Sequence, residues 1–144
     1  MKSVIRQLIG GALVRAKENG ELELSVTPGI VVEKPKEEKF GDFSTSVSMM
    51  LAKSERKKPR DIAEILCSHL KNGEGQVVAS VEVAGPGFIN LKMAPTFFLQ
   101  RLVGVAEEGV DFGASDVGMG RKVLLEFVSA NPTGPLHVGH GRGA

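Results

Sequence analysis

Apolar residues near the start of the chain recur at intervals of three and four positions. This spacing predicts an amphipathic helix that ends near Asn19-Gly20, and its apolar face consists of Val4, Ile5, Leu8, Ile9, Ala12 and Leu13. A second such pattern predicts a helix from Pro59 to Asn72-Gly73, with Pro59 in its first turn. His69 and Cys67 lie on the apolar side of this helix, so we expect both to be structural.

The segment between these helices gives shorter signals. Ile30–Val32 has the composition of a short strand. Gly41–Ser44 is typical of a turn that leads into a helix, whose buried side we predict to be Phe43, Val47, Met50 and Leu51. The run Lys53–Arg60 holds five basic residues, which could contact a nucleic-acid backbone or simply form a solvated loop between helices.

Two strand-like runs follow, Val77–Ala84 and Phe88–Met93, and Gly85-Pro86-Gly87 joins them. In the second run Ile89, Leu91 and Met93 share one face, whereas Phe88, Asn90 and Lys92 share the other. A ring, an amide and a cation in a row suit an unpaired RNA base, because the ring stacks, the amide binds a base edge and the ammonium meets phosphate. The alternative is that Phe88 fills a second apolar layer.

The rest of the chain suggests a change of domain. A helix opening at Pro95 is predicted to turn Phe98, Leu99, Leu102, Val103 and Ala106 inward. Residues 111–120 are glycine-rich and indicate a linker. Lys122–Ser129 is typical of a strand buried on both faces, as in parallel α/β sheets. We therefore expect an α+β fold: a small two-layer helix/sheet domain over 1–110, then over 121–144 the first strand and helix start of a truncated Rossmann-type α/β domain.

Composition narrows the class of protein. The 144 residues are 42% hydrophobic and 24% charged, which is typical of a globular chain and excludes intrinsic disorder. Eighteen Lys and Arg against 17 Asp and Glu give a net charge of +1, so a nucleic-acid contact must come from a local patch. The single cysteine has no disulfide partner in the chain, and we expect no metal site. No apolar run is long enough to span a membrane, so we expect a cytoplasmic protein.

The last residues carry the strongest chemical signal. A loop that contains two prolines precedes the expected start of a helix, and at this start lies the motif His137-Val138-Gly139-His140. In a helix the two histidines lie on the same face, beside free backbone N–H groups that favour phosphate. Two imidazoles at such a place can donate hydrogen bonds to a phosphate in its transition state. The alternative is a glycine-rich turn with two exposed histidines.

The closing segment from Glu126, EFVSANPTGPLHVGHGRGA, resembles the signature of arginyl-tRNA synthetases, a family of class I aminoacyl-tRNA synthetases. His137–His140 matches the HIGH motif of that class. Four upstream blocks resemble the N-terminal additional domain of the family: Gly41–Thr45, Leu51–Lys53, Pro59–Ala63 and Ala84–Asn90. The resemblance covers nearly the whole chain.

The resemblance implies an activity and the residues that serve it. The full-length enzyme would activate L-arginine with ATP, supplied as a complex with Mg²⁺, and attach the arginine to tRNA(Arg). His137 and His140 would be catalytic and, together with Gly139, would bind ATP. The positions that match arginine-contacting residues are Ser129, Asn131 and Glu126.

The resemblance also implies a role for the first domain. In the family this domain touches the outer corner of the tRNA at the D-loop, and the base-contacting pair corresponds to Phe88 and Asn90. Lys92 follows on the same strand face. Some family members carry a lysine three residues before the first motif histidine, where this chain has Gly134. The later lysine-bearing loop that would then serve is absent here, so we expect the chain alone to be inactive and to hold no bound cofactor.

Two other classes of function remain open from the sequence. A stand-alone RNA-binding module without catalysis would have no use for the His137–His140 motif. A small nucleotidyltransferase also uses such a motif but places it after the first strand of the chain, whereas here 136 residues precede it.

Overall fold

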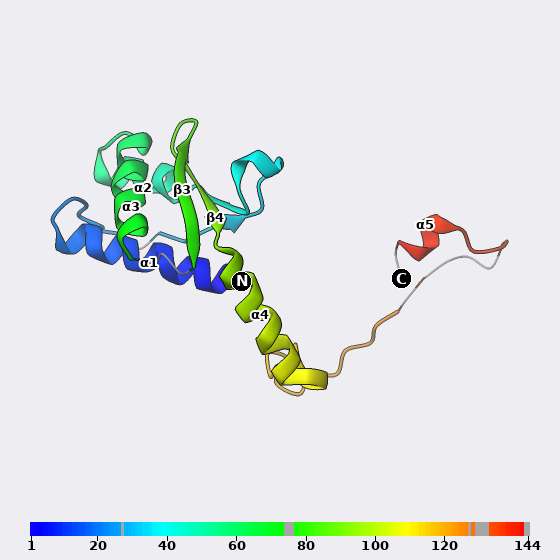
Figure 1. Ribbon diagram of the computed structural model, residues 1–144. Helices are drawn as coiled ribbons and strands as arrows, with labels where there is room; N and C mark the ends of the chain where they lie inside the picture. Colours follow the sequence, from blue (N-terminus) through cyan, green and yellow to red (C-terminus); the bar gives the residue numbers. More distant parts are fainter. Residues whose placement is uncertain (27, 74–76, 127, 129–132, 143–144) are drawn as a thin grey trace. The chain divides into compact units, whose positions relative to one another are not determined.

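The computed structural model describes residues 1–26, 28–73, 77–126, 128 and 133–142. The chain divides into two compact units, Met1–Gly109 and Val110–Ala144. The first unit combines helices with a small antiparallel sheet (Figure 1). The predicted α+β architecture is therefore confirmed for this unit.

The sheet has four antiparallel strands in the order β1-β2-β4-β3. Its main part is the hairpin of β3 (Val78–Ala84) and β4 (Phe88–Met93), which confirms the two strand-like runs of the sequence. β2 (Phe43–Thr45) pairs with β4, and β1 (Val32–Glu33) pairs with β2. β1 shares only Val32 with the strand expected at Ile30–Val32.

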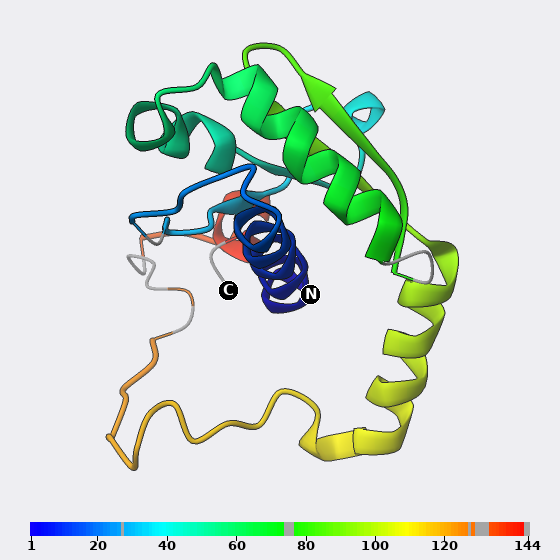
Figure 2. The same cartoon turned by 90° about the vertical axis from the view of Figure 1, so that its left-hand side faces the viewer.

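Three helices build the core against one face of this sheet. α3 (Pro59–Gly73) packs on β3 and β4, and α1 (Lys2–Glu18) and α2 (Val47–Glu55) pack on α3 (Figure 2). The predicted start of α3 and end of α1 are confirmed, and α1 is followed by Gly20 with a φ of 71°. Most of the largest completely buried apolar side chains come from α1, α3 and β4, among them Ile5, Ile9, Ile62, Leu66, Ile89 and Leu91, and α2 adds Leu51.

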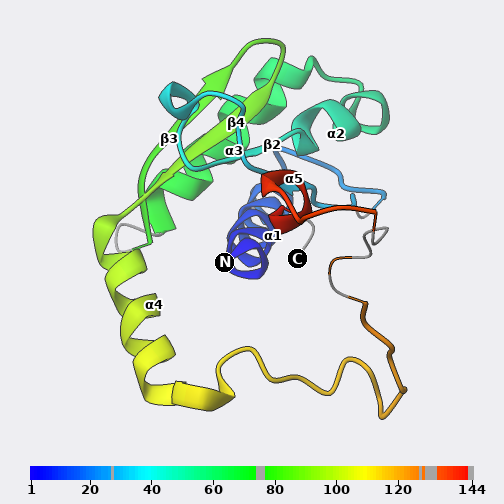
Figure 3. The same ribbon diagram turned by 90° about the vertical axis from the view of Figure 1, so that its right-hand side faces the viewer.

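The opposite face of the sheet is open apart from one short segment. The 3-10 helix η1 (Glu38–Phe40) lies beside β4 on this side (Figure 3). The chain then passes through Gly41 into β2. Phe43 was predicted to lie in a turn and on the buried side of the helix that follows. This prediction is wrong, because Phe43 pairs with Leu91 in the sheet. Val47 and Leu51 of that stripe are buried as predicted, whereas Met50 is 49% exposed.

α4 (Pro95–Glu108) begins at the predicted proline, but its apolar face was wrongly predicted to point inward. Only Phe97 is buried in this helix. The side chains expected to be inside are exposed, as shown by Phe98 at 36%, Leu99 at 60%, Leu102 at 63% and Val103 at 56%. The reason is that α4 leaves the end of β4 and extends away from the other helices of the first unit (Figure 1).

The second unit has little regular structure in its described part. It contains α5 (Val138–Gly141), and the short 3-10 helix η2 (Gly109–Asp111) leads into it. The strand predicted over Lys122–Ser129 is not formed in residues 121–126, which are irregular and exposed. A strand needs a partner for its backbone N–H and C=O groups, and among the described residues no sheet strand pairs with this segment. None of the helices in the described ranges is both long enough and apolar enough to cross a membrane.

Candidate nucleic-acid interface and nucleotide motif

β4 presents alternate residues to the core and to the open face of the sheet. Ile89 and Leu91 are fully buried, whereas Phe88 on the other face is 39% exposed. Asn90 is half-buried and Lys92 is exposed. The alternation predicted for this strand is therefore confirmed, and Phe88 does not fill a second apolar layer. Neither Asn90 nor Lys92 has a side-chain partner among the residues that the structure describes.

The hairpin tip that carries Phe88 is fixed to the helices behind it. The Ser48 hydroxyl of α2 donates a hydrogen bond to the carbonyl of Gly87. Gly87 has a φ of 141°, and a β-carbon there would lie 2.8 Å from Pro59 Cβ, so only glycine allows the turn to approach α3. Phe88 is thus presented from a rigid position, which lowers the entropy cost of binding a partner.

Hydrogen bonds also fix the residue that follows η1 to the neighbouring strand β4. The N–H of Asp42 donates to the carbonyl of Leu91 at 2.9 Å, and Asp42 Oδ2 accepts from the N–H of Met93 at 2.8 Å. These two bonds hold η1 against the strand. η1 brings Lys39 and Phe40 to the open face, and no pattern in the sequence had indicated these two residues.

A hollow of about 210 Å³ lies between η1 and the hairpin. Its lining combines two of the predicted tRNA-binding residues with five others: Asn90 and Lys92 with Lys39, Phe40, Gly41, Ser80 and Glu82. Glu82 is the sheet partner of Asn90, and Ser80 is the partner of Lys92. The three-residue turn 85–87 was the sequence signal that could have revealed these partners, because turn length sets hairpin register.

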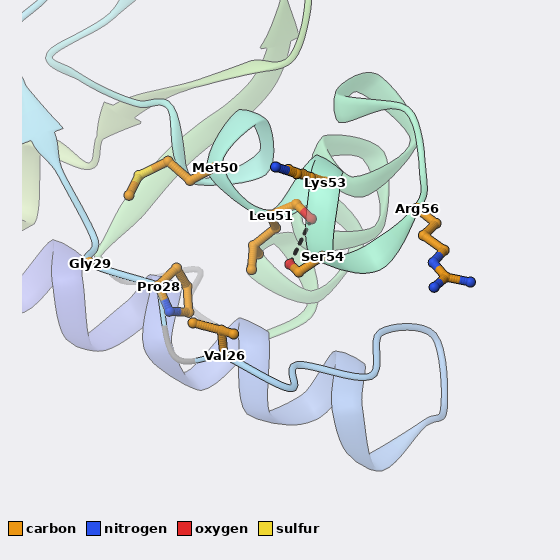
Figure 4. Close-up of a pocket in the computed structure, with 8 residues that line it drawn as sticks. All are labelled: Val26, Pro28, Gly29, Met50, Leu51, Lys53, Ser54 and Arg56. Atoms are coloured by element: carbon orange, nitrogen blue, oxygen red, sulfur yellow. Dashed lines mark hydrogen bonds between the residues drawn. The ribbon is translucent and has the colours of Figure 1, made fainter.

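The basic run after α2 is divided between internal contacts and solvent. Lys57 donates to the carbonyl of Glu21, and Arg60 forms an ion pair with Glu64 at 3.3 Å. Lys53 and Arg56 line a separate hollow between α2 and the segment before β1 (Figure 4). In that view Arg56 extends outward at the edge of the hollow. The run is therefore not one continuous free basic surface.

The two candidate groups on α3 are structural. The side chain of His69 forms a hydrogen bond with the Glu21 carboxylate, and the backbone carbonyl of His69 accepts from Arg15 at 3.3 Å, so His69 ties α3 to α1 and the segment after it. Cys67 is buried, and burial raises the pKa of its thiol to about 11. A thiol with such a pKa is a poor nucleophile at neutral pH.

The two motif histidines lie next to each other at the start of α5. His137 is the N-cap, and its Nδ1 accepts from the N–H of Gly139 at 3.1 Å. The Nδ1 of His140 accepts from the N–H of His137 at 3.1 Å, and the two rings stack with centroids 3.9 Å apart. Because both Nδ1 atoms accept, each neutral ring carries its proton on Nε2. This leaves two N–H donors on adjacent rings, of which His137 is exposed and His140 half-buried.

The remaining predicted site residues are Glu126, Ser129 and Asn131. Glu126 is exposed and irregular. Ser129 and Asn131 lie outside the described residues. Within the ranges that the structure describes, no group of three or more His, Cys, Asp or Glu side chains could hold a metal ion.

Comparison with known proteins gives consistent matches. The family model for the arginyl tRNA synthetase N terminal domain matches residues 3–93. An arginine–tRNA ligase of Geotalea daltonii is 49% identical over 144 residues, which are 100% of this chain and 26% of that protein. An arginine–tRNA ligase of Geobacter metallireducens is 46% identical with the same coverage. The chain thus spans about a quarter of the length of these curated relatives.

A solved structure supports the same assignment at the level of the fold. The crystal structure of arginyl-tRNA synthetase from Plasmodium falciparum matches with a TM-score of 0.56 and 14% identity. The match covers 69% of this chain and 17% of that one. At this identity the likeness concerns the fold alone, whereas the family model covers more than half of the sequence. The chain therefore belongs to the arginyl-tRNA synthetase N-terminal domain family.

Proposed function

We propose that this chain is the N-terminal portion of an arginine–tRNA ligase and that the open face of its sheet contacts the outer corner of tRNA(Arg). The full-length enzyme would activate L-arginine with ATP in the cytoplasm and transfer the arginine to tRNA(Arg). The family match and the relatives named arginine–tRNA ligase support this reaction. The first unit would serve recognition, and residues 121–144 would begin a Rossmann-type catalytic domain.

The observation that carries the recognition role is the pairing of Phe88 and Asn90 on one strand face. The ring is 39% exposed although it sits beside a completely buried residue, and the hairpin that holds it is fastened to α2 and α3. The Asn90 amide makes no hydrogen bond in the described structure. An exposed ring can stack on a base, and a free amide can both donate to and accept from a base edge.

Lys92 adds an electrostatic contact on the same face. Its ammonium has no carboxylate partner among the described residues and lies two positions beyond Asn90 on β4. A cation at this distance can meet the phosphate next to a base held by Asn90. Phosphate contacts hold the RNA in register, and base contacts supply the selectivity.

The second unit would supply the first ATP-binding segment. His137 and His140 offer two Nε2–H donors, and Gly139 between them has no side chain to obstruct a phosphate. The ATP would enter with its Mg²⁺, and arginine would be held by Ser129, Asn131 and Glu126 once the rest of the catalytic domain surrounds them. We therefore expect this chain alone to bind ATP negligibly and to form no arginyl-adenylate. Calorimetry with ATP·Mg²⁺ tests this expectation, and a specific site on the isolated chain would contradict it.

Titration of the chain with a tRNA(Arg) transcript tests the recognition role. Phe88→Ala should weaken binding about tenfold, because stacking is worth roughly 1–3 kcal/mol per base. Asn90→Ala should weaken binding by a similar factor, because hydrogen bonds to one base edge are worth roughly 1–3 kcal/mol. Phe98→Ala is a matched control, since it removes a ring of similar exposure, 36% against 39%, from α4. Equal affinity for all four proteins would remove the base-reading role.

A further inference from the structure

We propose that the hollow between η1 and the β3–β4 hairpin is a pocket for one unpaired nucleobase, in which Phe40 supplies a stacking wall and Glu82 selects a base that bears an exocyclic amino group. The inference rests on the proposed tRNA contact and extends it to residues that the strand β4 does not contain. It names the class of base that the site accepts.

Phe40 is held at the hollow by backbone contacts behind it. Gly41 has a φ of 87°, and its close approach to Leu91 fixes the end of η1 against β4. The Lys39 ammonium lies 4.9 Å from the centroid of the Phe40 ring and pairs with Glu37 at 2.7 Å. The ring remains 39% exposed, as much as Phe88. The open face therefore carries two fixed aromatic rings on two different segments.

Glu82 lies on the same face as Asn90. The two residues are directly opposed in the antiparallel ladder between β3 and β4, and opposed residues point to the same side of a sheet. The Glu82 carboxylate is exposed and has no ion-pair or hydrogen-bond partner within the described part of the chain. A free carboxylate beside a free amide offers an acceptor and a mixed donor and acceptor to one ligand edge.

The charges of the hollow distinguish a base from a phosphate. Glu82 repels an anion placed inside, whereas Lys92 attracts one at the rim, as does Lys39 to a smaller extent because it also pairs with Glu37. A neutral ring inside and a phosphate at the rim satisfy all three groups. The hollow has a volume of about 210 Å³. Sites for drug-sized ligands have volumes of about 300–1,000 Å³, so the smaller hollow suits one planar group.

The chemistry of the carboxylate sets the preference among bases. An ionised carboxylate only accepts hydrogen bonds, and adenine, cytosine and guanine each present an amino group on the Watson–Crick edge. Uracil presents a single N–H between two carbonyl oxygens, which the carboxylate repels. The pocket should therefore favour an amino-bearing base over uracil at the position it reads.

Binding of the 144-residue chain to a series of tRNA(Arg) transcripts tests the pocket. In each transcript one unpaired base of the corner loops is replaced by uracil. The natural chain should lose roughly tenfold in affinity for one member of the series, the size expected of one lost base contact. Glu82→Gln should reduce that preference to within about twofold, because the amide also donates to a carbonyl. Glu33→Gln, which removes an exposed charge from β1 outside the hollow, should keep the preference.

The stacking wall is tested with the unsubstituted transcript. Phe40→Ala and Phe40→Leu should both weaken binding, the alanine variant by roughly tenfold. A thermal unfolding curve like that of the natural chain confirms that these surface variants fold. The pocket is overturned if Phe40→Ala binds as tightly as the natural chain, if no uracil substitution matters, or if Glu82→Gln keeps the full preference. If Phe88→Ala and Asn90→Ala weaken binding in these cases, the proposed tRNA contact stands without the pocket, and if they do not, both fail.

Discussion

A β-carbon on Gly41 would lie 2.7 Å from the carbonyl oxygen of Leu91. The backbone of η1 can approach β4 this closely only because residue 41 has no side chain. Gly41 also has a φ of 87°, which other residues rarely adopt. One glycine thus decides whether Lys39 and Phe40 stand beside Asn90.

Gly41→Ala should destabilise the first unit by about 2 kcal/mol or more, since it combines a steric clash with left-handed strain. Urea denaturation measures the loss. Gly85→Ala is the matched control, because Gly85 also has a positive φ, 52°, but has no atom within 4 Å of an added β-carbon. The prediction fails if both variants lose the same stability.

Ser48→Ala should cost about 1–3 kcal/mol, because it leaves the carbonyl of the buried residue Gly87 without its hydrogen bond. The loss should appear as a lower urea midpoint with an unchanged m-value. Ser68→Ala serves for comparison, since the exposed Ser68 hydroxyl only bonds to Ile65 of its own helix. A Ser48→Ala midpoint equal to that of Ser68→Ala would show that the hairpin tip is not held in this way.

The buried thiol of Cys67 should make the protein less stable in alkaline solution. The pKa of its thiol is raised from an ordinary value of 9.0 to about 11, mainly by burial. Between these values the unfolded chain has lost the thiol proton and the folded chain retains it, so the free energy of unfolding falls as the pH rises from about 9 to 11. The contribution is at most about 1.4 kcal/mol per pH unit and is absent below pH 9.

Urea denaturation at several pH values, compared with Cys67→Ala, isolates this effect. The natural chain should lose more stability than the variant over the alkaline range, because only it has a buried thiol to ionise. Parallel curves for the two proteins would contradict the prediction.

Lys92→Gln should lower both the affinity for tRNA(Arg) and its salt dependence. Loss of one phosphate contact reduces the slope of log K against log salt by roughly 0.7–1. Asn90→Ala should instead lower the affinity and leave the slope unchanged, because it removes a base contact. Lys17→Gln on α1 is the control. If Lys17→Gln changes the salt slope as much as Lys92→Gln does, the effect comes from net charge alone.

The sequence predicted the elements whose signals are local. The alternation in Phe88–Met93 gave the buried and exposed faces of β4, because the period of two is a property of the strand itself. The apolar stripe of α1 was found for the equivalent reason at a period of 3.6. In both elements the same residues decide the local structure and the face that is buried.

The errors concern elements whose structure depends on distant segments. The Phe98 and Leu102 positions form an apolar helix face, but periodicity does not tell what covers such a face, and both are exposed. β2 has three residues, too few to show a period, and it exists because β4 pairs with it. The contribution of Phe40 to the open face was missed because it depends on Gly41 meeting Leu91, fifty positions away.

We expect tRNA(Arg) to bind on the open face of the sheet. Backbone amide NMR signals of the ¹⁵N-labelled chain, followed during titration with a tRNA(Arg) transcript, locate the contact directly. The largest shifts should fall at Phe88–Lys92 and Lys39–Gly41, with α1 unchanged. Shifts concentrated on α1 or in the second unit, with β4 unaffected, would contradict it.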